Sequence, residues 1–246
     1  MYKIINGIVL NRTDFHEYDR IVLLYTLELG KIKCLFKSVN KPEAKLIYFT
    51  EPATEVELQV VKLKNKNYID FFKVTGGRIV NYNIQLRTNL EIYNYTCKIL
   101  NLIDSVTLEL SKDENKFFLL KRIFEVLPYA SDKNLMYLAF VYRVIKLAGY
   151  MPQLYSCVSC KTKINKDSYF DILGGGVICD GCYVGVANKN LVLKISFNTI
   201  KLIQNFYKLN AYQINNLKID AQTLSEAEHI TNLYLQTFIH KPLVNV

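Results

Sequence analysis

Alternation of apolar and polar residues dominates the first third of the chain and predicts short β-strands. The clearest segment is Lys31–Lys37, where Ile32, Cys34 and Phe36 share one face and the three lysines the other. The alternation changes phase at Val60 and Val61, which predicts a β-bulge there. Five short strands with a long connection after the third are typical of a small antiparallel barrel, so an OB-fold is expected over residues 1–80. The expected strands cover residues 4–10, 20–26, 31–37, 54–63 and 68–74.

From about Asn83 the apolar spacing changes to a helical period. Asp132 is a candidate N-cap, Gly149 a candidate C-terminal stop, and Ser225–Glu228 has the spacing of a capping box. The sequence therefore predicts a multi-domain α+β protein with a boundary within residues 76–83 and a helical domain over residues 81–246. One expected buried stripe consists of Leu86, Leu90, Tyr93, Cys97 and Leu100. Further helices are expected over residues 113–129, 132–148, 196–209 and 224–240.

Four cysteines give the strongest local signal. Cys157, Cys160, Cys179 and Cys182 form the pattern C-x2-C-x18-C-x2-C, and the glycines of residues 174–176 and 181 allow tight turns. Two such turns can complete a tetrahedral shell of four thiolates around zinc. Because this shell leaves no open position, we expect one structural Zn²⁺ per chain in a module at about residues 155–190.

Composition excludes several classes of protein. The chain has 246 residues, 50% of them hydrophobic, which excludes a disordered polymer. The longest stretch without Asp, Glu, Lys or Arg, Leu147–Cys160, has 14 residues, whereas a membrane-spanning helix needs about 20. Met1–Asn6 does not have the pattern of an export signal, and the cysteines are not spaced as in a disulfide scaffold. A reducing, cytoplasmic location is therefore expected.

The positive charge suggests a polyanionic partner. The chain contains 31 Lys and Arg against 22 Asp and Glu, a formal charge of +9, and the segment Lys31–Lys45 alone carries +4. Such a cluster is either a solvated face or a binding surface for nucleic acid. In the second case we expect the cytoplasmic protein to be nucleoid-associated when it is bound to DNA. If the open face of the barrel follows a phosphate backbone, Tyr25 or Phe15 would supply a stacking surface. The candidate DNA-binding residues are Arg20, Lys31, Lys33, Lys37, Lys41 and Lys45.

Motifs for catalysis are missing from the sequence. There is no phosphate-binding G-x-x-x-x-G-K-[ST] loop, no H-x-E motif of a zinc deaminase, and no pair of carboxylates spaced for two metal ions. His16 lies beside Glu17 and Asp19, but a polar turn between two strands explains that group. The sequence therefore favours a binding protein and not an enzyme.

Several short motifs, taken in order, resemble the RecO family of bacterial recombination-mediator proteins over essentially the whole chain. Near the start these motifs are Gly7–Leu10, Glu17–Val22, Thr26, Gly30–Ile32, Lys41-Pro42 and Lys45-Leu46. In the second half they are Leu147–Leu154, Gly175-Gly176 and the four cysteines.

This resemblance implies an N-terminal OB-fold, a helical domain with a zinc module, and a role in DNA repair and recombination. It implies binding of single- and double-stranded DNA, annealing of complementary strands, and loading of RecA onto DNA coated by single-stranded-DNA-binding protein (SSB). The implied partners are RecR, the C-terminal tail of SSB and, in some settings, RecF. Within the family's basic loop this chain has Asn40, Glu43 and Ala44, from which we expect a weaker contact with DNA than in a typical member. The glycine often found after the second cysteine is Lys161 here.

Two other functions stay open from the sequence. One is a zinc-stabilised adapter whose basic surface meets acidic protein tails, with only incidental DNA binding. The other, ranked third, is a metal-dependent nuclease or hydrolase, which loss of substrate over time would reveal.

Overall fold

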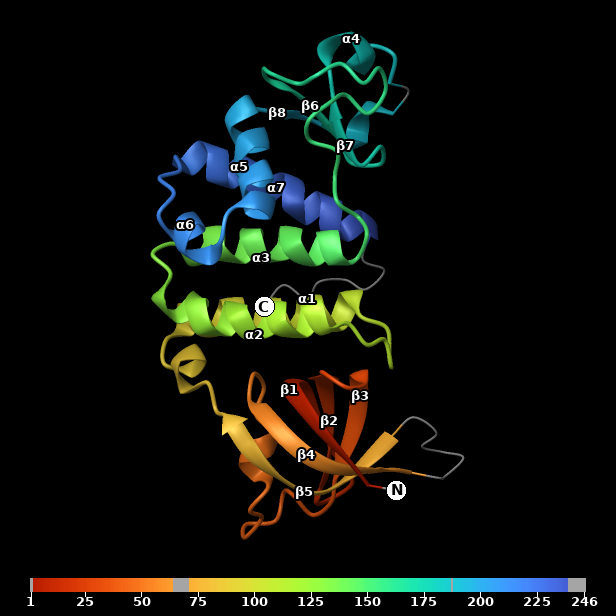
Figure 1. Cartoon of the computed structure of the whole chain (residues 1–246), viewed down its shortest axis with the longest axis vertical. Helices are drawn as coiled ribbons and strands as arrows, with labels where there is room; N and C mark the ends of the chain where they lie inside the picture. The colour runs from red at the N-terminus through yellow and green to blue at the C-terminus, as the bar shows by residue number, and fades with distance from the viewer. Residues whose placement is uncertain (1, 64–70, 187, 239–246) are drawn as a thin grey trace. The chain divides into compact units, whose positions relative to one another are not determined.

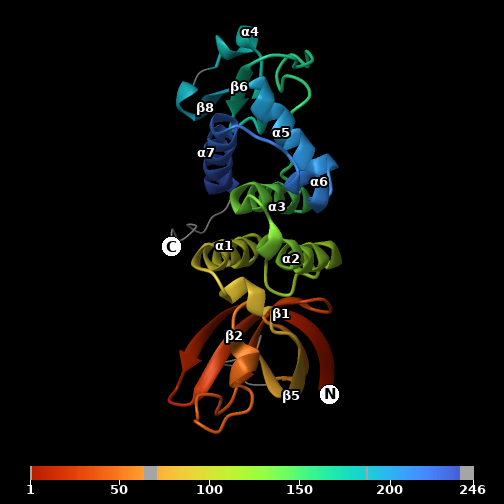
Figure 2. The same ribbon diagram turned by 90° about the vertical axis from the view of Figure 1, so that its left-hand side faces the viewer.

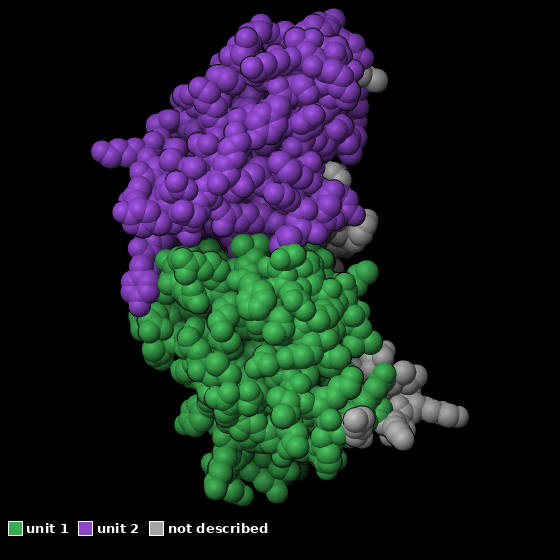
Figure 3. Space-filling model, in the orientation of Figure 1, with its two compact units in different colours: residues 1–128, 244–246 green, residues 129–243 purple. Residues whose placement is uncertain are grey.

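The protein folds into two compact units in the computed structural model, which describes residues 2–63, 71–186 and 188–238 (Figures 1 and 3). The first unit ends at Pro128 and the second begins at Tyr129. The expected domain boundary within residues 76–83 falls inside the first unit, since the two helices that follow the barrel belong to the same unit. A functional division near residue 80 stays a prediction.

Five strands of the first unit close into a barrel (Figure 2). Their order around the barrel is β1-β2-β3-β5-β4, and only the β3–β5 pair is parallel. This closure is that of an OB-fold, so the predicted fold class is confirmed. The bounds are β1 Tyr2–Phe15, β2 Asp19–Thr26, β3 Gly30–Phe36, β4 Glu55–Lys62 and β5 Phe71–Asn81.

Side chains at alternate positions of each strand fill the barrel. Ile32, Cys34 and Phe36 are each at most 1% exposed, as the alternation on β3 predicts. Burial raises the pKa of the Cys34 thiol, so this cysteine is a core residue without thiolate character. The other strands contribute Ile5, Val9, Val22, Leu24, Val56, Leu58, Val60, Phe72 and Val74, and Val39 of the loop after β3 joins the same core.

The expected bulge lies close to its predicted position. The β4–β5 register shifts between Gln59 and Val60, which pair with Gly76 and Val74. The extra residue is thus Thr75, on the partner strand. Beyond this bulge β5 continues to Asn81, further than expected, and residues 68–70 of the predicted strand lie outside the described residues.

The buried stripe expected on the first helix is wrong in part, since Leu86 and Leu100 are buried and Cys97 is half-buried, but the other two members are exposed. Helix α1 spans Leu90–Val106 and begins after Asn89, whose side chain accepts hydrogen bonds from two backbone N–H groups. Leu90 is 76% exposed and Tyr93 43%. The buried face runs instead through Ile92, Thr96, Ile99 and Ile103. Threonine is polar and so does not belong to an apolar pattern. The Thr96 hydroxyl can nevertheless be buried, because it donates a hydrogen bond to the Ile92 carbonyl.

The remaining helices largely follow the predicted ranges. Helix α2, Glu114–Val126, completes the first unit. In the second unit α3, Lys133–Leu147, is capped by Asp132 as predicted and is covered by α5, α6 and α7. These helices span Phe197–Lys208 (α5), Ala211–Asn215 (α6) and Ala221–Phe238 (α7). No helix in the described part of the chain is long and apolar enough to cross a membrane.

The predicted capping box of the last helix is also wrong. Asp220 caps α7, because its carboxylate accepts the N–H of Thr223 at 2.8 Å. Glu228, the acidic residue of the predicted box, instead accepts a hydrogen bond from the side-chain amide of Asn134 on α3, at 2.9 Å. A tertiary contact has thus replaced the local one. The expected end of this helix, His240, lies outside the described residues.

A small sheet in the second unit was not predicted. It has the order β7-β6-β8 and lies next to a single helical turn, α4. The bounds are β6 Ser168–Asp171, β7 Gly176–Ile178, α4 Asp180–Tyr183 and β8 Val192–Ile195.

Candidate metal centre and nucleic-acid interface

Two tight turns bring the four cysteines together. In the first, Lys161 N–H donates to the Cys157 carbonyl at 3.0 Å. In the second, Cys179 precedes α4, and its carbonyl accepts the N–H groups of Cys182 and Tyr183. The four Sγ atoms all lie within 4.8 Å of one another. These cysteines could therefore hold a metal ion.

The geometry fits zinc. With Zn–S bonds of about 2.3 Å, a tetrahedron has S–S edges of about 3.8 Å. The Sγ atoms of Cys160 and Cys179 are 3.6 Å apart, close to that edge and far too long for a disulfide bond.

The thiols do not share one pKa. A hydrogen bond with the Thr162 hydroxyl lowers the pKa of Cys160 to about 6. Hydrogen bonding to Cys160 raises the pKa of Cys182 to about 12. A divalent cation at this site would lower the pKa of all four thiols, since it stabilises every thiolate in the shell.

Strand contacts fix the module around the cysteines. Val158 N–H donates to the Val177 carbonyl, and Gly176 approaches the Gln153 carbonyl so closely that a Cβ would lie 2.4 Å from that oxygen. The rings of Tyr169 and Tyr183 stack with centroids 3.7 Å apart.

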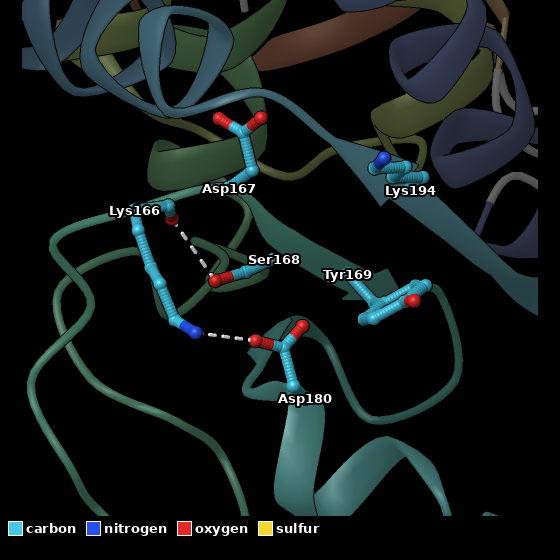
Figure 4. Close-up of a pocket in the computed structure, with 6 residues that line it drawn as sticks. All are labelled: Lys166, Asp167, Ser168, Tyr169, Asp180 and Lys194. Carbon is cyan, nitrogen blue, oxygen red and sulfur yellow. Dashed lines mark hydrogen bonds and ion pairs between the residues drawn. The ribbon is translucent and has the colours of Figure 1, made fainter.

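A shallow polar pocket lies on this module (Figure 4). Lys166 Nζ contacts the Asp180 carboxylate at 2.6 Å. The Asp167 carboxylate accepts the N–H of Phe197, at the start of α5. These contacts assign structural roles to Lys166, Asp167 and Asp180. The lining residues are Lys166, Asp167, Ser168, Tyr169, Asp180 and Lys194.

On the barrel, two of the six predicted DNA-binding residues are buried. Arg20 is 9% exposed, and its guanidinium donates to the Asp14 carboxylate and the Thr50 hydroxyl. Lys31 is 5% exposed, and its Nζ donates to the carbonyl and the carboxylate of Asp104 at 2.6 and 2.7 Å. The expectation that these two cations lie on an open face is therefore wrong.

The segment after α1 covers this end of the sheet. Leu110 N–H donates to the Lys31 carbonyl, and a Cβ on Gly30 would lie 2.2 Å from the Ser111 carbonyl oxygen. The Lys33 ammonium lies 2.5 Å from the Glu109 carboxylate, with 38% of its side chain exposed. Lys33 is thus accessible but paired with an acid.

The other three predicted cations are exposed. Lys37, Lys41 and Lys45 lie after β3, and the described part of the chain places no carboxylate within ion-pair distance of their ammonium groups. We call these three residues the loop lysines. Asn40 turns inward, and its amide donates to Asp14 at 3.0 Å.

The suggested stacking residues need correction. Tyr25 is fully buried, and its hydroxyl donates to the Asp113 carbonyl. Phe15 is half-buried, and its ring packs against His16. Exposed aromatic residues near the loop lysines are Tyr48 and Tyr18, and Lys41 lies over the ring of Tyr18. Sequence reasoning missed Tyr18, although an aromatic residue between Glu17 and Asp19 in a polar turn was a visible signal.

Comparison with known proteins agrees with this architecture. A family model described as the N-terminal domain of Recombination protein O matches residues 1–78. A second, described as the C-terminal domain of the same protein, matches residues 87–245.

Relatives named DNA repair protein RecO match over most of their length. The protein from Dehalococcoides mccartyi strain 195 is 29% identical, over 90% of this chain and 85% of its own. The protein from Pelotomaculum thermopropionicum is 26% identical, over 99% of this chain and 91% of its own. The protein from Syntrophus aciditrophicus is 24% identical, over 96% of this chain and 91% of its own. The chain belongs to the Recombination protein O family.

Proposed function

We propose that this protein acts in DNA repair and homologous recombination by binding DNA without catalysing a reaction. The observation that carries the proposal is the exposed group of loop lysines on an OB-fold barrel, in a chain of this family. Their ammonium groups would neutralise phosphates of single- or double-stranded DNA.

The salt dependence of binding follows from the number of free cations. Three phosphate contacts to a single strand give a slope of log K against log salt of about −2, from about −0.7 per contact. All six predicted residues would have given about −4. The smaller value applies because Arg20, Lys31 and Lys33 are engaged within the protein.

The test replaces Lys37, Lys41 and Lys45 by alanine. A matched control with the same change in charge replaces Lys189, Lys194 and Lys218, which are exposed in the second unit. Fluorescence anisotropy with a labelled single strand should show a slope near zero for the first variant and a wild-type slope for the control. Equal slopes for all three proteins would place the DNA elsewhere.

The larger activity that we propose is strand annealing and mediation. Phosphate neutralisation reduces the repulsion between two complementary strands, so base pairing proceeds on one surface. By analogy with the family, RecR, the SSB tail and RecF are the partners, RecA is loaded onto SSB-coated DNA, and the location is cytoplasmic. Loading is tested by RecA filament formation on SSB-coated strands with RecR, with and without this protein.

We further propose that the metal is zinc, bound once per chain in a structural role. The four thiolates and the Sγ distances support this identity. Elemental analysis of the purified protein should give about one zinc per chain. A fully folded protein without tightly bound metal would contradict it.

One observation favours a second candidate, the zinc-stabilised adapter. Half of the predicted cations are used in contacts within the protein, which reduces the positive surface left for DNA. An adapter would bind the acidic tail peptide of SSB without accelerating annealing, and the two assays together separate the candidates.

A further inference from the structure

The turn between β1 and β2 holds an aromatic ring beside Lys41, one of the loop lysines. Tyr18 is 41% exposed, in a turn flanked by Glu17 and Asp19. The ammonium of Lys41 lies over its ring, 5.4 Å from the centroid. An exposed ring next to free cations has the composition of a binding site for single-stranded nucleic acid.

Two hydrogen bonds connect the turn that carries Tyr18 to the loop that carries Lys37 and Lys41. Asn40 N–H donates to the Tyr18 carbonyl at 3.0 Å, and Ser38 N–H donates to the Asp19 carboxylate at 2.7 Å. The turn and the loop that carries Lys37 and Lys41 are therefore tied together. A strand whose phosphates contact these lysines would pass next to the ring.

We propose that Tyr18 is a stacking site for one unpaired base, and that it lets the protein bind single strands more tightly than duplex DNA. This inference rests on the proposed DNA binding by the loop lysines. Every base offers a flat face to an aromatic ring, so stacking is independent of sequence. In a duplex both faces of each base are covered by neighbouring bases, so the ring gains nothing. The long Lys41 side chain can leave the ring and contact the adjacent phosphate.

The test compares Tyr18→Leu with Tyr18→Phe, which keeps the stacking face. Tyr212→Leu is the matched control, since Tyr212 is 77% exposed in the second unit, which carries none of the loop lysines. Affinities are measured by anisotropy for an oligo-dT strand, a strand of abasic sites and a duplex of equal length. Thermal melting of each variant checks that it is folded.

We expect Tyr18→Leu to bind oligo-dT about five- to twentyfold more weakly, with an unchanged salt slope. Its affinities for the abasic strand and the duplex should equal those of the wild type. Tyr18→Phe and Tyr212→Leu should behave as wild type on all three ligands.

An equal loss on all three ligands, or no loss on oligo-dT, would overturn the stacking site. Salt-dependent binding by the wild type in either case would leave the proposed function standing. A wild-type protein that binds none of the three ligands would show that the proposed function itself had failed.

Discussion

Replacing Lys31 by methionine tests whether this lysine stabilises the fold or contacts DNA. Its Nζ makes two hydrogen bonds to Asp104, at 2.6 and 2.7 Å, and its side chain is 7% exposed. Methionine fills a similar volume but removes the charge and both bonds.

The loss of stability can be estimated from these contacts. Removing one partner of a buried ion pair costs about 3–5 kcal/mol, because the other charge stays buried. The Asp104 side chain keeps 28% exposure, so water can solvate part of its charge after the substitution. We therefore expect a loss of about 2–3 kcal/mol in the free energy of unfolding, below the full cost.

The assay is urea unfolding followed by circular dichroism, since the chain has no tryptophan. The matched control is Lys37→Met, which changes an exposed lysine of the same barrel. It should change stability by less than about 0.5 kcal/mol but make the salt slope of single-strand binding about 0.7 less negative. Lys31→Met should leave that slope unchanged. Wild-type stability of Lys31→Met together with a flatter slope would refute our interpretation.

Three further substitutions test other contacts. Glu109→Gln releases Lys33 from its ion pair, so the salt slope of single-strand binding should become about 0.7 more negative. An unchanged slope would show that Lys33 lies away from DNA. Cys179→Ser removes one of the four ligands, so zinc content should fall well below one per chain with a lower melting temperature, and full zinc retention would contradict the site. Lys161→Gly should raise the free energy of unfolding by about 0.5–1 kcal/mol, because residue 161 has a φ of +63°, where a side chain is strained. A lower melting temperature of this variant would contradict that expectation.

Local patterns in the sequence predicted what local physics determines. The alternation on β3 placed Ile32, Cys34 and Phe36 in the core, since pleating alone decides which residues share a face. The spacing of the cysteines predicted their cluster by similarly local reasoning, because a single turn brings the two thiols of each pair together.

Contacts between distant segments could not be predicted in this way. Lys31 has the same periodicity as Lys33 and Lys37, but it is buried by contacts with Asp104, 73 residues later, and with the segment that follows α1. The cap of α7 was mispredicted because the helix is capped earlier in the chain, by Asp220, and Glu228 contacts Asn134 on another helix. The sheet β7-β6-β8 was missed because strands of three or four residues are too short to show a period.

Annealing of two dye-labelled complementary oligonucleotides, each coated with SSB, tests the central claim most directly. The rate is measured across a salt series with the wild type, with the alanine variant of Lys37, Lys41 and Lys45, and with the charge-matched control of the second unit. We expect acceleration by the wild type and the control that fades as salt rises, and none by the alanine variant. No acceleration by folded, zinc-loaded wild-type protein, or equal acceleration by the alanine variant, would contradict the account.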